Sequence, residues 1–425
     1  MLSKEKLKQI LFEQREIILN KPLGVERTSL SKVAEYKKLP HIIVITGLRR
    51  IGKSTFLRQI IHKYYSDKDF YYINFEDERL FNFKAEDFND IYETLIELFE
   101  EKRTIFIDEI QNITHFELFV RRFYDAGFKF FITGSNANLL SRELGTKLTG
   151  RYLDIKINPF SFWEYLKMKK IKLSNEMLYK TAIRGKVKKL FGNYLINGGM
   201  PEFVIYEDKE ILNRIYDDII IKDIAVRYSI YNLSEMRELF QYLISNFANK
   251  FSYTKITKMV GLGSVNTAKN YVMFLSETFF VSVVNKFDFS LKKQIVNEKK
   301  IYLIDNGFIQ RISTKLTKDM GWFLENLVFN ELKKDSMVYY FSYKNRVCDF
   351  IVEKGQNIIN AVQVCWEFTN DNREREINGL TTAMDFFNLN YGLILTNDQE
   401  DELKIDNKKI ELIPVWKWLL QKDGL

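Results

Sequence analysis

The segment that is most capable of chemistry fits the pattern G-x-x-x-x-G-K-[ST], and it consists of Gly47, Leu48, Arg49, Arg50, Ile51, Gly52, Lys53 and Ser54, followed by Thr55. We expect the two glycines to let backbone N–H groups turn inward around phosphate oxygens, with the following helix adding the positive end of its dipole. Lys53 can reach the β and γ phosphates of a nucleotide, and Ser54 offers a hydroxyl to Mg²⁺. The segment therefore predicts a site for ATP and Mg²⁺.

Two acids follow an apolar run at residues 104–107, which is typical of a buried strand. We expect Asp108 to hold Mg²⁺ through water, and Glu109 to orient or deprotonate the water that attacks the γ-phosphate. By itself such a pair is commonly a turn or a helix cap, but its distance from the phosphate loop favours the catalytic interpretation. Gln111 is a further candidate for positioning that water.

Further candidates follow the next strand. Ser135 or Asn136 would sense the γ-phosphate if their strand lies beside that of Asp108, and the alternative is a helix cap, which prefers the same residue types. Arg151 ends a basic segment and is our candidate for an arginine offered to the nucleotide of a neighbouring subunit. The alternative for Arg151 is an ordinary surface contact.

The elements that must position these residues are short apolar runs at residues 42–45, 70–75, 104–107 and 129–133. The segments between them are long enough for crossover helices, so the pattern predicts an α/β fold with a doubly wound parallel sheet. We assign residues 39–158 to this core, after an N-terminal helical lead-in at residues 1–38.

The rest of the chain changes character twice. Residues 159–248 are mostly helical in pattern and are predicted to form a lid, and residues 249–310 have the helix, helix, strand, strand order of a winged helix. Residues 311–425 predict a second α/β unit. The polar face that carries Asn266, Lys269 and Asn270 would meet bases and phosphates in a DNA groove, whereas many winged helices serve only as protein-contact modules.

Composition narrows the class of protein. The 425 residues are 46% hydrophobic and 28% charged, with a net charge of +8, which suits a globular protein and permits nucleic-acid binding. Only two cysteines occur, which favours a reducing cytoplasm, and the three histidines lie at no zinc-ligand spacing. No run reaches the roughly 18 apolar residues of a membrane span.

The motifs at residues 47–54, 105–111, 132–136, 148–152 and 158–162 resemble the archaeal and bacterial AAA+-like ATPases of the MNS type. Residues 194–202, 301–308 and 323–328 are similar to the C-terminal domain of unknown function in those proteins. The resemblance covers nearly the whole chain, and it implies ATP binding and hydrolysis, a P-loop core, a winged helix and a nuclease-like tail. It does not imply a substrate.

The tail resembles the PD-(D/E)xK nuclease fold through Glu325, Asp349 and the strand at residues 361–366. Active members present an acid and, two residues later, a lysine on that strand, where this chain has Gln363 and Cys365. A neutral amide and a thiol supply neither the anionic oxygens nor the base of two-metal hydrolysis, and the missing lysine has no evident replacement in the sequence. We therefore expect a degenerate nuclease-like domain.

These observations predict a cytoplasmic, Mg²⁺-dependent ATPase. Its nucleotide state would rearrange the lid, the winged helix and the tail, on DNA or on a DNA-bound protein, with a homo-oligomer if Arg151 acts in trans. The alternative from another class is a nucleotide-gated signalling or scaffold module that contacts proteins rather than DNA. A third interpretation is a working nuclease, which would cut DNA with Mg²⁺ or Mn²⁺ and would lose cutting in Asp349→Ala.

Overall fold

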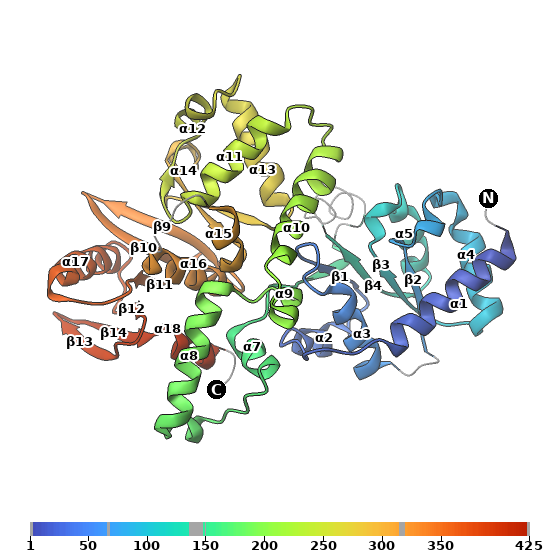
Figure 1. The fold of residues 1–425 in the computed structure, drawn as a ribbon, viewed down its shortest axis with the longest axis horizontal. Coiled ribbons are helices and arrows are strands. Elements are labelled where there is room, and N and C mark those ends of the chain that lie inside the picture. Colours follow the sequence, from blue (N-terminus) through green and yellow to red (C-terminus); the bar gives the residue numbers. More distant parts are fainter. Residues whose placement is uncertain (1–2, 66–68, 136–147, 149, 314–318, 423–425) are drawn as a thin grey trace. The chain divides into compact units, whose positions relative to one another are not determined.

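The computed structural model describes residues 3–65, 69–135, 148, 150–313 and 319–422. The chain divides into two compact units (Figure 1). The first unit comprises residues 1–158 with 277–279, and the second comprises residues 159–276 with 280–425.

The first unit is built on a five-stranded sheet in the order β2-β3-β4-β1-β5, and every neighbouring pair of strands is parallel. Its strands are β1 (Ile42–Thr46), β2 (Tyr71–Asn74), β3 (Thr104–Asp108), β4 (Lys129–Gly134) and β5 (Tyr152–Lys156). The predicted α/β fold with a parallel sheet is confirmed. Because parallel strands all end at the same edge, the loops after β1, β3 and β4 meet there.

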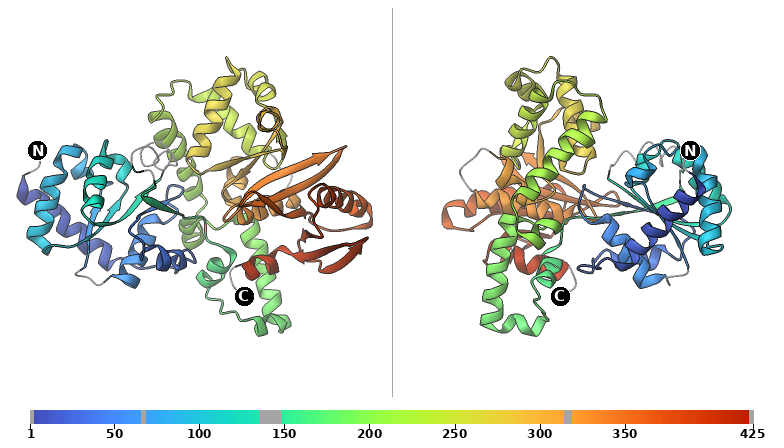
Figure 2. Two further views of the ribbon diagram at one scale, coloured as in Figure 1. Left: turned by 180° about the vertical axis from the view of Figure 1, so that it is seen from behind. Right: turned by 45° about the vertical axis from the view of Figure 1, so that its right-hand side comes forward.

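Helices cover both faces of this sheet (Figure 2). The strand residues Val44, Ile73 and Ile107 belong to one buried core with residues of α1 (Lys4–Asn20), α4 (Phe88–Phe99) and α5 (Phe116–Asp125). On the other face lie α2 (Leu30–Tyr36) and α3 (Lys53–Tyr64), and Tyr65 just after α3 packs its ring on Phe106 and Phe131. Each fully buried large apolar side chain contributes about 1.5–3 kcal/mol to folding.

Two elements of the first unit differ from the sequence expectation. Helix α1 packs Leu7, Ile10 and Leu11 into the core of the sheet, so the N-terminal segment is part of this unit. Strand β5 was absent from the predicted strands because only Ile155 is buried in it and Asp154 is exposed, which leaves no apolar run to recognise.

The second unit begins with helices. They are α7 (Phe162–Met168), a 3-10 helix (Asn175–Tyr179), α8 (Thr181–Asn197), α9 (Pro201–Tyr206), α10 (Glu210–Asp218), a π-helical segment (Ile219–Val226) and α11 (Leu233–Ser245). A three-stranded antiparallel sheet follows in the order β6-β8-β7. Its elements in chain order are β6 (Lys250–Phe251), α12 (Tyr253–Val260), α13 (Val265–Glu277), β7 (Val281–Asn285), α14 (Leu291–Val296) and β8 (Lys299–Leu303).

The remainder forms a six-stranded mixed sheet in the order β13-β14-β12-β11-β10-β9. Its strands are β9 (Met337–Tyr343), β10 (Arg346–Lys354), β11 (Asn357–Val364), β12 (Tyr391–Thr396), β13 (Asp401–Ile405) and β14 (Lys408–Pro414). The accompanying helices are α15 (Asn306–Ile312), α16 (Met320–Leu332), α17 (Asn370–Phe386) and α18 (Val415–Lys422). Leu380, Ala383 and Met384 of α17 pack into the core of this sheet.

Within the described parts of the chain, no helix combines the length and the apolar character needed to cross a membrane.

Candidate active site

The phosphate loop lies between β1 and α3, at the carboxyl edge of the parallel sheet. Gly47 has φ +150°, and a Cβ atom there would lie 2.5 Å from the carbonyl oxygen of Ile157, so a side chain is excluded. Gly52 has φ +95° and caps the N-terminus of α3, in a conformation that L side chains rarely adopt. The two glycines therefore shape the loop that the sequence predicts.

Lys53 is the first residue of α3, and only 4% of it is exposed. Its ammonium lies 3.5 Å from the carbonyl oxygen of Gly47, 3.3 Å from that of Leu48 and 3.3 Å from Oε1 of Glu109. The charge therefore points into the loop, where phosphate oxygens would bind.

Asp108 ends β3 and is 1% exposed. Its Oδ1 accepts a hydrogen bond from the hydroxyl of Thr133, and its Oδ2 accepts one from the hydroxyl of Tyr72 at 3.2 Å. Burial, with the nearby charge of Glu109, raises the pKa of Asp108, although hydrogen bonds from Thr133 and Ser54 oppose this rise. A bound cation would relieve the cost of burying this carboxylate.

Glu109 follows Asp108 in a left-handed conformation, with φ +53°. Such a conformation costs a residue other than glycine about 1–3 kcal/mol, and it is typical of functional sites. Burial opposes the ionisation of Glu109, but the charge of Lys53 and a hydrogen bond from Gln111 outweigh it and lower the pKa of Glu109. The side chain is therefore a carboxylate at neutral pH, as a group that orients water requires.

Thr133 connects the two acids. Its hydroxyl donates to Asp108 and accepts a hydrogen bond from the backbone N–H of Glu109 at 2.9 Å. Gln111 lies between Glu109 and Ser135, with its Nε2 3.3 Å from the Ser135 hydroxyl. Its Oε1 is buried and has no hydrogen-bond partner among the described residues. Asn136 lies outside the described residues.

Arg151 lies elsewhere in this unit. It precedes β5, and its carbonyl oxygen accepts a hydrogen bond from the N–H of Ile42, at the amino ends of the strands. Its guanidinium pairs with Asp125 at 2.8 Å and lies over the ring of Tyr124. The phosphate loop is at the opposite edge, so the structure does not bring Arg151 to the other site residues of its own chain.

Sequence reasoning missed Tyr72. Burial, with the charge of Asp108 next, raises the pKa of Tyr72 well above its ordinary value, so it remains a hydrogen-bond donor to Asp108. The contact with Asp108 depends on the pairing of β2 with β3 in the sheet, which the sequence pattern does not reveal. The two residues are 36 positions apart in the chain, which hides the pairing from local motifs.

A cavity of about 350 Å³ adjoins these residues, and its wall includes Ser54, Tyr72, Asn74 and Asp108. Mg²⁺ prefers oxygen ligands and retains several waters, so a serine hydroxyl, a carboxylate and room for water fit this ion. The donor set of the phosphate loop likewise fits a triphosphate, because glycine turns, a helix N-terminus and a buried ammonium converge there.

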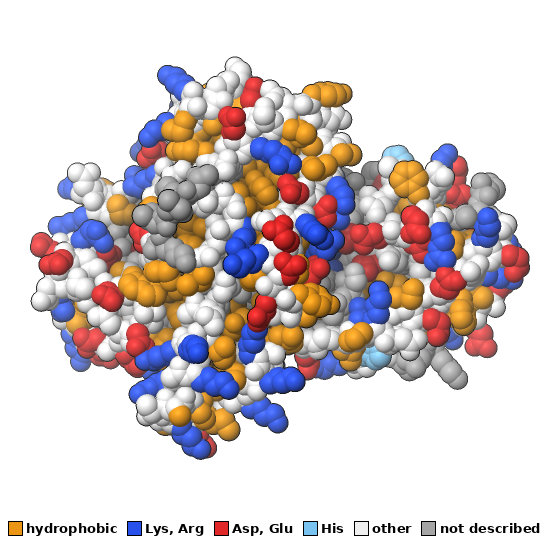
Figure 3. All heavy atoms as spheres, in the orientation of Figure 1, with side chains coloured by type: hydrophobic (Ala, Val, Ile, Leu, Met, Phe, Trp, Pro, Cys, Tyr) orange, Lys and Arg blue, Asp and Glu red, His pale blue; other side chains and the backbone are white. Residues whose placement is uncertain are grey.

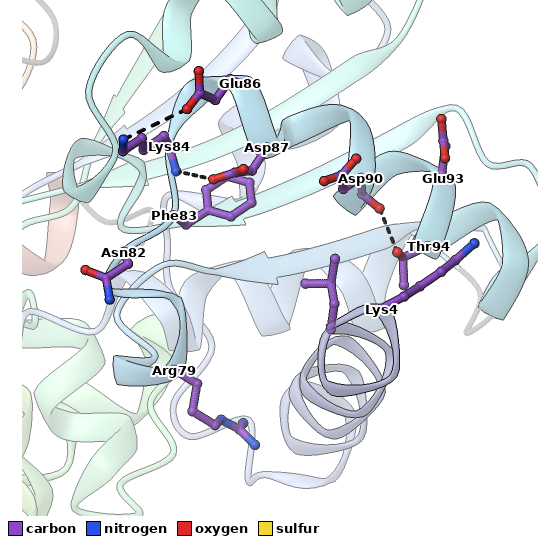
Figure 4. Close-up of a pocket in the computed structure, with 11 residues that line it drawn as sticks. Lys4, Arg79, Asn82, Phe83, Lys84, Glu86, Asp87, Asp90, Glu93 and Thr94 are labelled. Atoms are coloured by element: carbon purple, nitrogen blue, oxygen red, sulfur yellow. Dashed lines mark hydrogen bonds and ion pairs between the residues drawn. The ribbon is translucent and has the colours of Figure 1, made fainter. Parts of the chain in front are cut away.

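A second cavity of the same unit has a different character (Figure 4). It measures about 420 Å³, and most of the side chains that line it are charged, such as Lys84 and Glu86, which lie 3.9 Å apart. None of the predicted site residues lines it.

Comparisons with known proteins agree with this geometry. Residues 39–166 match a family described as AAA domain, and residues 188–319 match a domain of unknown function (DUF8612). An uncharacterised protein of Methanocaldococcus jannaschii, MJ1544, is 36% identical over 97% of this chain and 96% of its own length. An uncharacterised protein of Haemophilus influenzae is 30% identical over 95% of this chain and 100% of its own length. The chain belongs to the family of these proteins.

The residues that match the AAA domain include the phosphate loop, Asp108 and Glu109. Solved structures show lower similarity. The Orc1 protein of Aeropyrum pernix in complex with DNA is 10% identical, with a TM-score of 0.33 over 70% of this chain and 95% of that chain. Cdc6p from Pyrobaculum aerophilum is 13% identical, with a TM-score of 0.28 over 71% of this chain and 92% of that chain.

Proposed function

We propose that this protein is a Mg²⁺-dependent ATPase whose nucleotide state rearranges the rest of the chain. The observation that carries the proposal is the meeting of Lys53, Asp108 and Glu109 at one edge of the parallel sheet. A phosphate loop alone would bind nucleotide, whereas the added pair of acids supplies groups for metal binding and for hydrolysis.

Each residue has a distinct role in this proposal. Lys53 would leave Glu109 and bind the β and γ phosphates, while Ser54 and Asp108 would hold the metal. Mg²⁺, when bound, supplies positive charge that neutralises the phosphate oxygens. Glu109, released from Lys53, then accepts a hydrogen bond from the attacking water and orients it. Thr133 and Gln111 fix the backbone and the carboxylate of Glu109 during this exchange.

Arg151 enters the proposal only through a second copy of the chain. Its position at the amino edge of the sheet and its partial exposure support presentation to a neighbour, and its pairing with Asp125 supports a merely structural role equally well. The native mass of Glu109→Gln, measured with and without ATP, distinguishes the trans role of Arg151 from the structural role. An ATP-dependent assembly would support the trans role, and a monomer under both conditions would remove it.

We further propose that residues 159–248 form a lid, residues 249–310 a winged helix and residues 311–425 a nuclease-like domain. The order α12, α13, β7, β8 and its small antiparallel sheet support the second assignment. Helix α16 against a mixed sheet that carries Asp349 on β10 supports the third.

DNA is the partner that the charges favour. Lys and Arg side chains gather over α8 (Figure 3), where Arg184, Lys186 and Lys189 are exposed. Asn266, Lys269 and Asn270 are exposed along α13. Clusters of this kind bind phosphates and release counterions, so the affinity would fall as salt rises.

One observation favours the protein-contact alternative. Leu291, Ile295 and Val296 of α14 are 70%, 61% and 78% exposed, which is unusual for large apolar side chains in one short helix. DNA stimulation of the ATPase with salt-sensitive binding would support the DNA proposal. Absence of any DNA response, together with a stable protein complex, would support the alternative.

The ATPase assignment itself is tested by comparing phosphate release from wild type, Lys53→Ala and Glu109→Gln. Equal turnover in all three would defeat the assignment.

A further inference from the structure

The second unit contains an open cleft of about 720 Å³ formed by α16, β10, β11 and α17. Four buried polar residues line it: Glu325, Asp349, Gln363 and Glu376. The nuclease-like resemblance implies a divalent metal ion between the acids of this cleft, so the contacts of each acid decide whether such an ion fits.

A lysine from another element reaches both acids. Lys300 lies on β8 and is 6% exposed, and its ammonium is 2.8 Å from Oε1 of Glu325 and 3.6 Å from Oδ1 of Asp349. Cys365 occupies the position where the nuclease motif has its lysine. Because Lys300 reaches both acids, the sequence expectation that this lysine has no replacement is wrong. The replacement comes from β8, at a position 65 residues before Cys365 in the chain (365 minus 300).

Neutral hydrogen-bond donors also contact the two acids. The hydroxyl of Tyr302 donates to Oε1 of Glu325 at 2.6 Å, and the N–H of Val364 donates to Oδ2 of Asp349 at 3.0 Å. Three of the four carboxylate oxygens of this pair thus already accept hydrogen bonds or face the ammonium.

The strand positions of Gln363 and Cys365 are no better suited to binding a metal ion. Gln363 donates its amide to Glu376 at 2.5 Å and accepts from the N–H of Asp349 at 3.3 Å, so both of its polar atoms are committed. Burial, with the charge of Glu376 next, raises the pKa of Cys365 to about 12, which keeps it a thiol rather than a metal-binding thiolate. Among the described residues, no group of three or more His, Cys, Asp or Glu side chains is placed to hold a metal ion.

We propose that the ammonium of Lys300 takes the place of the divalent cation, so that this cleft is a metal-free site. Two carboxylates buried side by side repel each other and require a compensating positive charge. Lys300 supplies that charge permanently from inside the protein, where a metal ion would compete with it for the same oxygens.

The electrostatics of Lys300 agree with this role. Burial by itself would favour the neutral amine, but the charges of Glu325 and Asp349 outweigh burial and raise the pKa of Lys300. The ammonium therefore stays charged at physiological pH. Because β8 pairs with both β6 and β7, the same contact ties the small antiparallel sheet to α16 and β10.

Mn²⁺ binding to the full chain without nucleotide tests this inference, with bound ions counted by electron paramagnetic resonance. Asp349→Asn retains the Lys300 to Glu325 ion pair and should bind as many ions per chain as wild type. Lys300→Met should bind one additional ion, which the double variant with Asp349→Asn should lose. Lys250→Met is the matched control, because Lys250 pairs with Lys300 in the same sheet and is exposed.

Lys300→Met leaves two buried carboxylates without a cation, so its unfolding temperature should fall and should recover in Mn²⁺. If that variant is recovered only unfolded, Lys300→Gln, which keeps a hydrogen-bond donor without the charge, takes its place. One Mn²⁺ fewer in Asp349→Asn than in wild type would overturn the inference. A folded Lys300 variant that gains no ion would overturn it as well.

Discussion

The ammonium of Lys53 lies 3.3 Å from Oε1 of Glu109, so the phosphate-binding cation and the hydrolytic carboxylate bind each other. In this arrangement neither group can act, because each neutralises the charge that the other needs. Binding of a triphosphate would transfer Lys53 to phosphate oxygens and release Glu109 at the same moment. A nucleotide in the loop would thereby free the carboxylate of Glu109 to orient the attacking water.

Lys53→Ala removes the cation from the phosphate loop. Turnover should fall by about 10²-fold or more, because a preorganised charge at the transferred phosphate is lost. Lys63→Ala is the matched control in the same helix, since Lys63 is exposed and pairs with Glu26 at the surface. Phosphate release at saturating ATP measures both, and similar losses in the two variants would contradict the role of Lys53.

Glu109→Gln separates binding from hydrolysis. Turnover should fall by about 10²–10³-fold, whereas ATP affinity should be retained or rise, because Lys53 no longer has a competing carboxylate. Exposed Glu93 on α4 provides the control, Glu93→Gln, with turnover close to wild type. Weaker binding of ATP by Glu109→Gln would show that the ion pair shapes the loop rather than blocking it.

Tyr72→Phe should affect the metal more than the nucleotide. The variant keeps the buried ring and removes only the hydroxyl that donates to Asp108. The Mg²⁺ concentration for half-maximal activity should rise about 10-fold, because groups that orient a metal ligand typically contribute this much to metal affinity. Tyr64→Phe, which removes a hydroxyl hydrogen-bonded to Leu30, serves as the control. An unchanged Mg²⁺ requirement in Tyr72→Phe would exclude this positioning role.

Asp305 predicts a pH dependence of stability in the second unit. Burial raises its pKa to about 6, against two hydrogen bonds from the N–H groups of Gly199 and Gly307. A folded pKa above the ordinary 3.8 means that the folded state binds the proton more tightly, so this contribution is full below pH 3.8 and is lost as pH rises through 6. The difference, 6 minus 3.8, corresponds to about 3 kcal/mol.

Asp305→Asn should abolish that contribution. The difference in free energy of unfolding between wild type and variant should change by about 3 kcal/mol between pH 3 and 7, in favour of the variant at the higher pH. Urea unfolding followed by tryptophan fluorescence reports this unit alone, because all five tryptophans lie after residue 158. Asp319→Asn is the control, since Asp319 caps α16 in a similar way but is exposed. A pH-independent difference would refute the shift.

The basic face of α8 predicts a salt effect. Replacing Arg184, Lys186 and Lys189 with glutamine should weaken DNA binding and reduce the slope of log affinity against log salt by up to about three, near one per lost phosphate contact. Glutamine at exposed Lys344, Lys354 and Lys404 is the matched control. Fluorescence anisotropy with duplex DNA at several salt concentrations measures the slope, and identical slopes in the two triple variants would remove α8 from the interface.

The sequence was most informative where function is local. The phosphate loop and the pair at Asp108 and Glu109 are each contained in a few residues, and buried parallel strands have a strong apolar signal. The fold class followed from the same signal. Strand β5 was missed because only one of its residues, Ile155, is buried, so it has no apolar run. Its pairing with β1 becomes visible only in the assembled sheet.

Relationships between distant residues could not be read from the chain. Tyr72 meets Asp108 only because β2 pairs with β3, and Lys300 meets Glu325 only because β8 packs on α16. The motif in the tail suggested an absent lysine, whereas tertiary packing supplies one from another element. The position of Arg151 was equally hidden, because it directly precedes β5, which the apolar pattern did not predict.

Calorimetric titration of ATP with Mg²⁺ into Glu109→Gln tests the central claim most directly, since binding is measured without turnover. The account predicts uptake of one ATP per chain, and loss of that uptake when Lys53→Ala is added. No detectable heat at millimolar ATP, in this variant and in wild type, would contradict it.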